Sequence, residues 1–348
     1  MIRIQEHLNI DNADLYLDNL AKELWIFLNP MKVNKNEFKK SSLIKKLNAL
    51  LELVDNPEYF KKYANNSRLI LFLQKEFLEY LKNNSYEKLK LLVISRPSDL
   101  LKLKNEILGL SPINIFYSNK EGKLGQTNFG KLLSEKLFNY SGFRGTQFCH
   151  ELMIRSGFDG VTCPYCNDSK IEILDISEEN EETVRLKAYL DIDHFYPKSP
   201  NPFLALSYYN LIPSCTNCNS REKGNKEFCI LTHNHPYLDS FDKRYFFRID
   251  AKTMTDNDSL EIRLDYLDKT RLDFTNRDLN ILNRYSGKNL KDAIKLKNLY
   301  QDYHHYLDVA EFEGAFKDLL LANIPIHSCE ILKNINGKLN RDIIKQID

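Results

Sequence analysis

The sequence lacks the features that would place a protein in or across a membrane. No stretch approaches the roughly 18 to 20 apolar residues that a membrane-spanning helix requires. The opening segment, MIRIQEHLNIDNADLY, has no apolar core after a basic start, so it does not resemble a secretory signal peptide. We therefore expect no membrane partner and a cytoplasmic location.

The sequence also has almost no excess of positive over negative charge, and it has few of the residues that break helices. The 348 residues include 49 Lys and Arg against 48 Asp and Glu, a net charge of +1, so only a local basic face could indicate a nucleic-acid partner. With 12 Gly, 11 Pro and 43% hydrophobic residues, the composition is that of an ordinary globular protein and argues against disorder. The length predicts two or three packed domains, and we find no internal repeat of fixed period.

Helical periodicity dominates the first part of the chain, up to residue 148. The first predicted helix stops at Asn29-Pro30, and its apolar positions share one face: Leu17, Leu20, Ala21, Leu24 and Leu28. Similar stripes occupy residues 43–54 and 69–81, with a break expected at Asn83-Asn84-Ser85. From residue 276 onward the periodicity is again helical.

The middle of the chain has the pattern of strands. Residues 170–174 and 185–192 are rich in strand-forming residues and flank an acidic stretch at 177–183, which predicts a hairpin. Residues 244–250 and 260–264 predict a second, shorter hairpin. Fold class is therefore predicted as α+β.

Four of the seven cysteines form two C-x-x-C pairs, Cys163/Cys166 and Cys215/Cys218. In a reducing compartment this spacing favours a tetrahedral Zn²⁺ site over disulfides. Four protein ligands leave no open position, so the zinc should be structural and should clamp the hairpin to a short helix expected after Cys215. The alternative is a coincidence of buried thiols, as we expect for Cys149, Cys229 and Cys329.

A carboxylate and an imidazole are adjacent between the two pairs, at Asp193-His194. Neighbouring side chains on a regular strand point to opposite faces, so the two groups cannot share one metal ion. Asp193 could hold a hard cation such as Mg²⁺, while His194, with an unperturbed pKa near 6.5, could act as a general base. Asn210 and Asn219 follow in the same segment, and Asn219 comes directly after the last cysteine of the second pair.

The run CPYC … DIDHFYPKSPNPFLALSYYNLIPSCTNCNSREKGNKEF resembles the bacterial HNH endonucleases of the His-Me finger superfamily, in the subgroup whose ββα-metal unit is framed by two C-x-x-C zinc pairs. The resemblance covers under a quarter of the chain. It implies that His194 is the general base, that Asp193 and Asn219 bind the catalytic Mg²⁺ or Mn²⁺, and that Asn210 fixes the loop that orients His194. The last motif position is Asn219 where the family name has His, and an amide oxygen suits Mg²⁺ or Mn²⁺.

Several cations and one histidine near the motif are candidate substrate contacts. The basic residues could hold phosphates on either side of the scissile bond, although solvated surface lysine is an equally good reading: Lys198, Arg221, Lys223 and Lys226. His235, in the segment His233-Asn234-His235-Pro236-Tyr237, could line the substrate groove or form a structural His-Pro turn.

These observations predict a mostly helical chain with a central zinc-stapled ββα-metal nuclease finger. We expect a helical region at 1–148 for recognition, regulation or partner docking, the HNH nuclease at 149–240, and a mostly helical region with a short hairpin at 241–348. The resemblance implies hydrolysis of phosphodiester bonds, in DNA rather than RNA, in bacterial defence or a mobile element. The alternatives are a nuclease subunit that depends on a partner such as an ATPase, and a zinc finger that binds nucleic acid without catalysis.

Overall fold

The computed structural model describes residues 2–33, 37–120, 123–178, 184–255, 261–268, 270–306, 309, 318, 321–322 and 324–347. The chain is α+β, as predicted: helices predominate, and the strands form small antiparallel sheets. Within the described residues no helix is both long enough and apolar enough to cross a membrane. Most of the acidic stretch predicted at 177–183 falls outside the described residues, since 179–183 are not among them.

Contacts divide the chain into two compact units. Unit 1 comprises Met1–Ala13, Met153–Ile192 and Pro213–Asp348, and unit 2 comprises Asp14–Leu152 and Asp193–Ile212. The division runs through the predicted nuclease region, so the three sequential functional regions stay a prediction.

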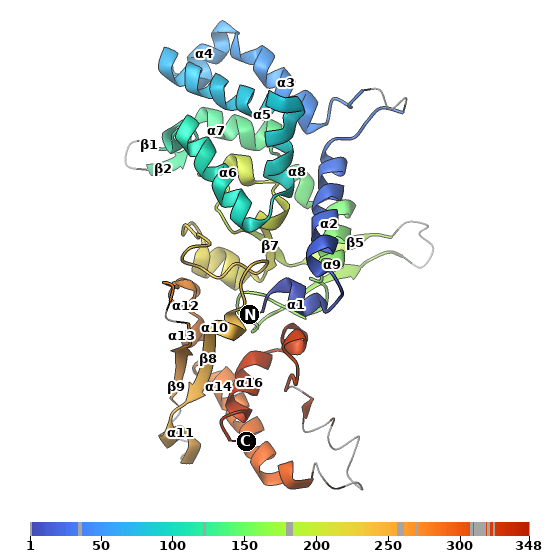
Figure 1. The fold of residues 1–348 in the computed structure, drawn as a ribbon, viewed down its shortest axis with the longest axis vertical. Coiled ribbons are helices and arrows are strands. Elements are labelled where there is room, and N and C mark those ends of the chain that lie inside the picture. Colours follow the sequence, from blue (N-terminus) through green and yellow to red (C-terminus); the bar gives the residue numbers. More distant parts are fainter. Residues whose placement is uncertain are drawn as a thin grey trace. The chain divides into compact units, whose positions relative to one another are not determined.

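Unit 2 is built mainly from helices of the first half of the chain (Figure 1). Its elements are α2 (Ala13–Leu28), α3 (Leu43–Val54), α4 (Pro57–Tyr63), α5 (Arg68–Ile94), α6 (Pro97–Leu110), η1 (Ile113–Ile115), β1 (Tyr117–Lys120), β2 (Lys123–Gln126), α7 (Asn128–Leu132), η2 (Leu133–Leu137), α8 (Tyr140–Arg144), α9 (Gln147–Arg155), η3 (Pro202–Leu204) and η4 (Tyr208–Asn210). The helix α9 begins in unit 2 and ends in unit 1.

Local sequence signals set the limits of these helices. α2 ends before Asn29-Pro30, as predicted, and four of its five stripe residues are buried. Ser42 and Ser67 cap α3 and α5 by accepting hydrogen bonds from backbone N–H groups of the first turn. The stripe of α3 is buried throughout, whereas Leu69 at the start of α5 is 66% exposed, so the predicted third stripe is buried only in its later part.

A cluster of phenylalanines joins the segment 193–212 to the helices of unit 2. Phe203 of η3 lies 5.3 Å from Phe116 and 6.1 Å from Phe77, measured between ring centroids. Phe129 of α7 contacts the same two rings. All four are essentially unexposed, and rings of this size dominate the apolar area buried in a core.

Two features of unit 2 differ from the expected run of helices. Residues 117–120 and 123–126 form the antiparallel pair β1–β2, which lacks the alternation of apolar and polar residues that predicts a strand. The predicted break at Asn83-Asn84-Ser85 is present as a kink within α5, where Asn84, Ser85 and Tyr86 have positive φ.

Unit 1 contains the remaining strands and the C-terminal helices. Its elements are α1 (Ile4–Leu8), β3 (Val161–Thr162), β4 (Lys170–Asp175), β5 (Leu186–Tyr189), η5 (Asn217–Lys223), α10 (Phe241–Arg244), β8 (Tyr245–Ile249), α11 (Ala251–Thr255), β9 (Ile262–Tyr266), α12 (Thr275–Leu279), α13 (Ile281–Tyr285), α14 (Lys288–Tyr303), η6 (His304–Tyr306), η8 (Ser328–Lys333) and α16 (Gly337–Ile344). Two further strands, β6 (Asp191–His194) and β7 (Leu211–Ser214), pair with each other. Each of them contains a boundary between the two units, after Ile192 and after Ile212.

Both predicted hairpins are present, with one correction. β4 pairs with β5 and β8 pairs with β9, each in antiparallel register. The predicted strand 185–192 is interrupted at Leu190: β5 ends at Tyr189, and β6 begins at Asp191 and pairs with a different partner. The interruption matters because it separates the strand of the hairpin from the strand that carries Asp193 and His194.

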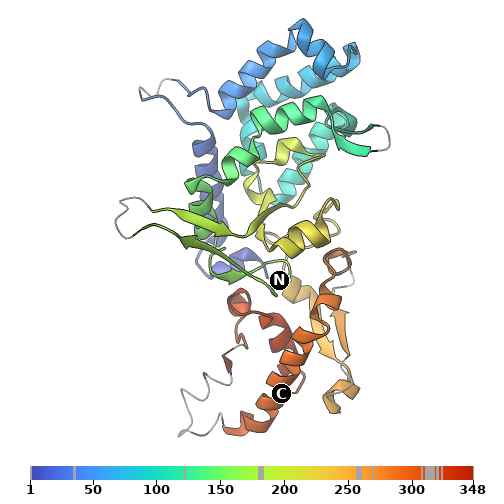
Figure 2. The same ribbon diagram turned by 180° about the vertical axis from the view of Figure 1, so that it is seen from behind.

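The C-terminal elements of unit 1 are drawn in orange and red in Figure 2. Among them, a buried ionic network joins α16 to α10 and β8. The Lys338 ammonium lies 2.9 Å from Asp242 and 2.6 Å from Asp342, and Phe247 of β8 donates its N–H to Asp342 at 3.0 Å. The side chains of Lys338 and Asp342 are each 1% exposed. Burial raises the pKa of Asp342, although Lys338 opposes this effect.

Candidate functional site

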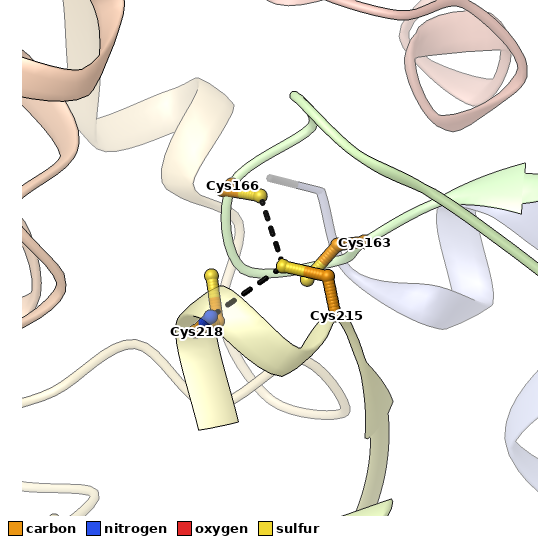
Figure 3. A group of neighbouring side chains, drawn as sticks. All are labelled: Cys163, Cys166, Cys215 and Cys218. Carbon is orange, nitrogen blue, oxygen red and sulfur yellow. Dashed lines mark hydrogen bonds between the residues drawn. The ribbon is translucent and has the colours of Figure 1, made fainter. Parts of the chain in front are cut away.

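Four buried cysteines of unit 1 come together, as the sequence predicted. Their ligand atoms all lie within 4.8 Å of one another, and the sulfurs of Cys166 and Cys215 are 3.8 Å apart. Sulfurs bound at about 2.3 Å to one tetrahedral ion would be about 3.8 Å apart. Figure 3 shows the side chains of Cys163, Cys166, Cys215 and Cys218 turned toward a common point. The cluster therefore suits a metal ion such as zinc.

Each C-x-x-C pair is held in a tight turn by its own backbone. Asn167 donates its N–H to the carbonyl of Cys163 at 2.8 Å, and Asn167 has the left-handed φ of 57° that asparagine tolerates. In the second pair, the N–H of Cys218 points at the sulfur of Cys215 at 3.5 Å, and Asn219 donates its N–H to the Cys215 carbonyl. Each turn directs both sulfurs of its pair to the same side.

Residues of the C-terminal helices surround the cysteine cluster. Arg284 of α13 places Nη1 3.1 Å from the sulfur of Cys218 and Nη2 3.2 Å from a carboxylate oxygen of Asp168. Tyr285 donates its hydroxyl hydrogen to the carbonyl of Cys166. Burial opposes the charge on Arg284, but the neighbouring sulfurs of Cys166 and Cys218 outweigh it and raise the pKa of Arg284. A buried cation at this place would offset the negative charge of four thiolates on one zinc ion.

The predicted general base, His194, lies at the end of β6 in unit 2. Its side chain is 6% exposed, and its Nε2 is 3.0 Å from the carbonyl oxygen of Ala205. A carbonyl oxygen only accepts, so this contact requires the hydrogen of a neutral imidazole to be on Nε2. The basic lone pair of His194 is then on Nδ1. Asp193, the preceding residue, is also buried, at 3% exposure.

The side chain of Asn210 forms three hydrogen bonds with the loop that follows His194. Its Oδ1 accepts the N–H of Tyr196 at 2.7 Å, and its Nδ2 donates to the carbonyls of Tyr196 at 3.1 Å and Leu204 at 3.0 Å. Phe195 donates its N–H to the Asn210 carbonyl at 2.9 Å. The amide thus ties both ends of the loop that supplies the carbonyl of Ala205.

The neighbouring Tyr209 anchors this segment to the first long helix of unit 2. Its hydroxyl donates a hydrogen bond to Asp18 of α2 at 2.6 Å, and the same carboxylate accepts hydrogen bonds from two nitrogens of Arg96 at 2.7 to 3.2 Å. Burial disfavours the charge on Asp18, but Arg96 and Tyr209 outweigh it and lower the pKa of Asp18.

Tyr140 of α8 also contacts His194, and nothing in the sequence indicated it. The two ring centroids are 4.4 Å apart with the rings at 76°, an edge-to-face contact. The ammonium of Lys198 lies 4.4 Å from the centroid of the same Tyr140 ring. Partial burial and the nearby charge of Arg144 lower the pKa of Lys198.

Asn219, the last motif position, lies in unit 1 beside a carboxylate that we did not predict. Its Nδ2 donates to Asp191 at 3.1 Å, and the hydroxyl of Ser220 lies 3.5 Å from the same oxygen. Asp191 and Asp193 are two residues apart on β6, so a regular strand directs both side chains to one face. That spacing is the signal in the sequence that could have identified Asp191.

The remaining predicted contacts differ in their access to solvent. Arg221 is exposed, and Lys226 is exposed but donates to the carbonyl of Asp278 at 2.6 Å. Lys223 is only 2% exposed, with its ammonium 4.9 Å from the ring centroid of Phe228.

His235 is completely buried, and its Nδ1 accepts the N–H of Tyr237 at 3.2 Å. This arrangement fits the structural His-Pro turn. The burial of His235, like that of Lys223, places it away from any substrate that approaches through solvent.

Comparison with known proteins gives one distant relative. The chain is 28% identical to Protein ea31 of Escherichia phage lambda in a match that extends over 181 aligned positions and covers 47% of this chain. The matched part spans 54% of the phage protein, about half its length. No protein-family description matches the chain, and no solved structure matches it.

Proposed function

We propose that this chain is a metal-dependent HNH endonuclease that hydrolyses phosphodiester bonds, in DNA rather than RNA. The observation that carries the proposal is the fixed imidazole. Asn210 ties the loop after His194, and the Ala205 carbonyl of that loop accepts from Nε2 of His194. A histidine held in one tautomer, with its second ring nitrogen carrying the basic lone pair, is the arrangement that a general base requires.

The chain's own residues account for the proton transfer. Nδ1 of His194 takes a proton from a water molecule, and the water oxygen forms a bond to phosphorus. The bond from phosphorus to the 3′ oxygen then breaks, which leaves a 5′-phosphate and a 3′ oxygen that takes up a proton from solvent. The edge-to-face contact with the Tyr140 ring and the hydrogen bond to the Ala205 carbonyl hold the imidazole in one orientation during this transfer.

The predicted cation ligands are oxygen donors, which fit Mg²⁺ or Mn²⁺ better than a soft metal. Asp193 of unit 2 would supply a carboxylate oxygen, and the part of Asn219 in binding the cation is what the resemblance implies. When bound, the cation would neutralise charge on the phosphate oxygens. The four cysteines would hold zinc and stabilise the start of η5, which carries Asn219.

The test is cleavage of supercoiled plasmid and of labelled RNA by purified protein with Mg²⁺ or Mn²⁺, with EDTA as a control. A positioned base contributes about 10²- to 10⁴-fold, so we expect His194→Ala to lower the cleavage rate by at least about a hundredfold. The matched control is His305→Ala, since His305 is exposed. Zinc content and melting temperature should be unchanged in both. Cleavage by His194→Ala at the wild-type rate would contradict the assignment of the base.

Two alternatives remain as outcomes of the same experiment. If the folded, zinc-loaded protein binds DNA but cuts no substrate, a non-catalytic zinc-finger module or a nuclease subunit that needs a partner such as an ATPase is favoured. Addition of host extract with ATP distinguishes these two. A role in a mobile element or in bacterial defence is proposed from the resemblance to HNH endonucleases alone.

A further inference from the structure

Unit 2 contains a cavity of about 450 Å³. Its lining comes from the end of α2, the start of α3, the helix α8 and the segment after Ala205, all of which belong to unit 2. Sites for small ligands usually have volumes of about 300 to 1,000 Å³. The residues proposed for cleavage do not line this cavity, so it calls for a role of its own.

The walls of the cavity are apolar and partly aromatic. Leu43, Phe143 and Leu206 are buried and form its inner part. Phe27 also lines it and is 37% exposed, and Phe148 stacks on the Phe27 ring with 4.1 Å between the centroids. An exposed aromatic ring offers a surface on which another planar ring can stack. The walls therefore suit a ligand with a flat, apolar body.

Lys46 of α3 is the one charged residue among the described residues that line the cavity. It is partly buried, and no described carboxylate forms an ion pair with it. This burial lowers the pKa of Lys46. An anionic group on a ligand would stabilise the ammonium, because opposite charges attract more strongly where water is partly excluded.

Asn139 supplies a hydrogen-bond donor to the same cavity. Its Oδ1 accepts the N–H of Gly142 at 2.9 Å, which caps α8 and commits the amide oxygen. In the part of the chain that the structure describes, Nδ2 of Asn139 donates to no acceptor. The edges of nucleobases carry nitrogen and oxygen acceptors that such an amide can bind.

Two lining residues are chain neighbours of the groups that hold His194. Asn139 precedes Tyr140, whose ring packs against His194. Leu206 follows Ala205, whose carbonyl oxygen lies 3.0 Å from Nε2 of His194. The cavity therefore adjoins both segments that fix the predicted base.

We infer that this cavity takes one unpaired nucleotide of the nucleic-acid strand, close to the bond that is cut. The base would stack on Phe27 and accept a hydrogen bond from Asn139, and the phosphate would contact Lys46. This role rests on the proposed nuclease function. Proteins that bind unpaired strands combine aromatic side chains, on which bases stack, with cations that contact the backbone. A base within a duplex cannot enter such a cavity, so the protein should prefer unpaired strands.

The simplest alternative is an unfilled gap between helices that holds no ligand. Such a gap needs neither a cation nor an unused amide in its lining. A partly buried ammonium without a partner would only lower the stability of the fold. The presence of both groups in one apolar cavity favours a ligand that is flat, anionic and able to accept a hydrogen bond.

The experiment measures binding without cleavage, in the full chain carrying His194→Ala and loaded with zinc. A fluorescein-labelled strand of about 20 thymidines, longer than the sites that such proteins cover, is titrated by anisotropy at several salt concentrations. Phe27→Ala should weaken binding about fivefold or more, as expected for the loss of one stacked base. Lys46→Gln should weaken it about two- to fivefold. It should also reduce the slope of log affinity against log salt by about 0.7, the value for one phosphate of a single strand.

Two further probes separate the base from the phosphate. On a labelled strand of abasic nucleotides, Phe27→Ala should have no effect, whereas Lys46→Gln should keep its effect. On a fully paired duplex of the same length, neither substitution should change the affinity.

The controls are exposed residues of the same unit that do not line the cavity. Lys45→Gln removes the lysine next to Lys46, and Phe72→Ala removes an exposed ring of α5. Ser41→Trp should obstruct the cavity and weaken strand binding, because Ser41 is exposed and lines it, whereas Ser98→Trp adds the same indole to α6. Circular dichroism and melting temperature identify any variant that fails to fold.

The outcomes separate this site from the proposed function. If wild-type protein cleaves DNA in a His194-dependent way but Phe27→Ala and Lys46→Gln bind like their controls, the cavity site is wrong and the nuclease stands. If these substitutions weaken strand binding but the wild-type protein cuts nothing, the site stands and cleavage by this chain is wrong. If calorimetry shows that the protein binds thymidine monophosphate but no strand, the ligand is a free nucleotide and the site for a strand is wrong. If the wild-type protein neither binds nor cleaves nucleic acid, both are wrong.

Discussion

Two buried asparagines, Asn167 and Asn210, hold turns that no regular helix or strand would maintain. Asn167 donates to the carbonyls of Ile331 and Asn334, each at 2.9 Å, and accepts the N–H of Lys338 at 2.9 Å. Asn210 makes three side-chain bonds within the loop that follows His194. A short amide offers both donors and an acceptor, so it can satisfy several buried backbone groups at once.

Replacing Asn210 with Ala should therefore lower the free energy of unfolding. The change leaves a buried N–H and two buried carbonyls without their partner, which costs about 2 to 4 kcal/mol. Urea unfolding followed by circular dichroism measures the effect. Asn283→Ala is the control, because Asn283 is exposed and should change stability by less than about 0.5 kcal/mol. Equal effects of the two substitutions would contradict the role given to the Asn210 bonds.

At the residue scale, the sequence predicted the cysteine cluster, because two local C-x-x-C turns supply its four sulfurs, and it missed the single side chains that pack against the predicted sites. The spacing of the cysteines was enough to predict their cluster, because each pair is a local turn. The same spacing said nothing of Arg284, which lies 66 residues beyond Cys218, or of Tyr140, which precedes His194 by more than fifty positions. Burial of Lys223 could not be read from the sequence either, since it depends on the position of the Phe228 ring.

At the scale of elements, strand prediction succeeded where one face is apolar. In the second predicted hairpin every second residue of the first strand is apolar and buried: Tyr245, Phe247 and Ile249. This hairpin is present as β8–β9. The side chains of the β1–β2 pair are little buried, so its sequence has no alternation of apolar and polar residues from which the strands could be predicted. The break at Leu190 was missed because apolar character continues from β5 into β6, and only the choice of pairing partner separates the two strands.

The helix α16 gives a prediction at this scale. Lys338→Met should lower the free energy of unfolding by about 3 to 5 kcal/mol, because it leaves the carboxylates of Asp242 and Asp342 buried without this ammonium. Lys345→Met, an exposed substitution at the end of the same helix, should have little effect.

Chemical denaturation of a double variant tests the electrostatic cause. Adding Asp342→Asn to Lys338→Met removes a buried charge that Arg341, 3.5 Å away, would be left to balance together with that of Asp242, and it keeps an oxygen to accept the N–H of Phe247. Part of the lost stability should return. If the double variant is less stable than Lys338→Met alone, lost packing of the lysine stem explains the effect better than charge does.

At the scale of the whole molecule, the cysteine cluster lies in one unit and the phenylalanine cluster lies in the other. All four cysteines and the residues that surround them, Asn167, Arg284 and Tyr285, belong to unit 1. The rings of Phe77, Phe116, Phe129 and Phe203 belong to unit 2. A chain that passes between the two units four times can thus place separate stabilising features in each.

Loss of zinc should accordingly loosen unit 1 far more than unit 2. We expect Cys218→Ser to bind zinc weakly and to lose protection from amide hydrogen exchange in β3, η5, α13 and α16, because ligand binding in such sites contributes directly to folding. Amides of α3 and α5 should keep their protection. Mass spectrometry of exchange, with zinc content measured on the same sample, gives the answer, and Cys229→Ser is the control because Cys229 lies outside the cluster. Equal loss of protection in both units would mean that they unfold as a single cooperative body, and retention of protection in unit 1 would mean that the cysteines pack without needing a metal.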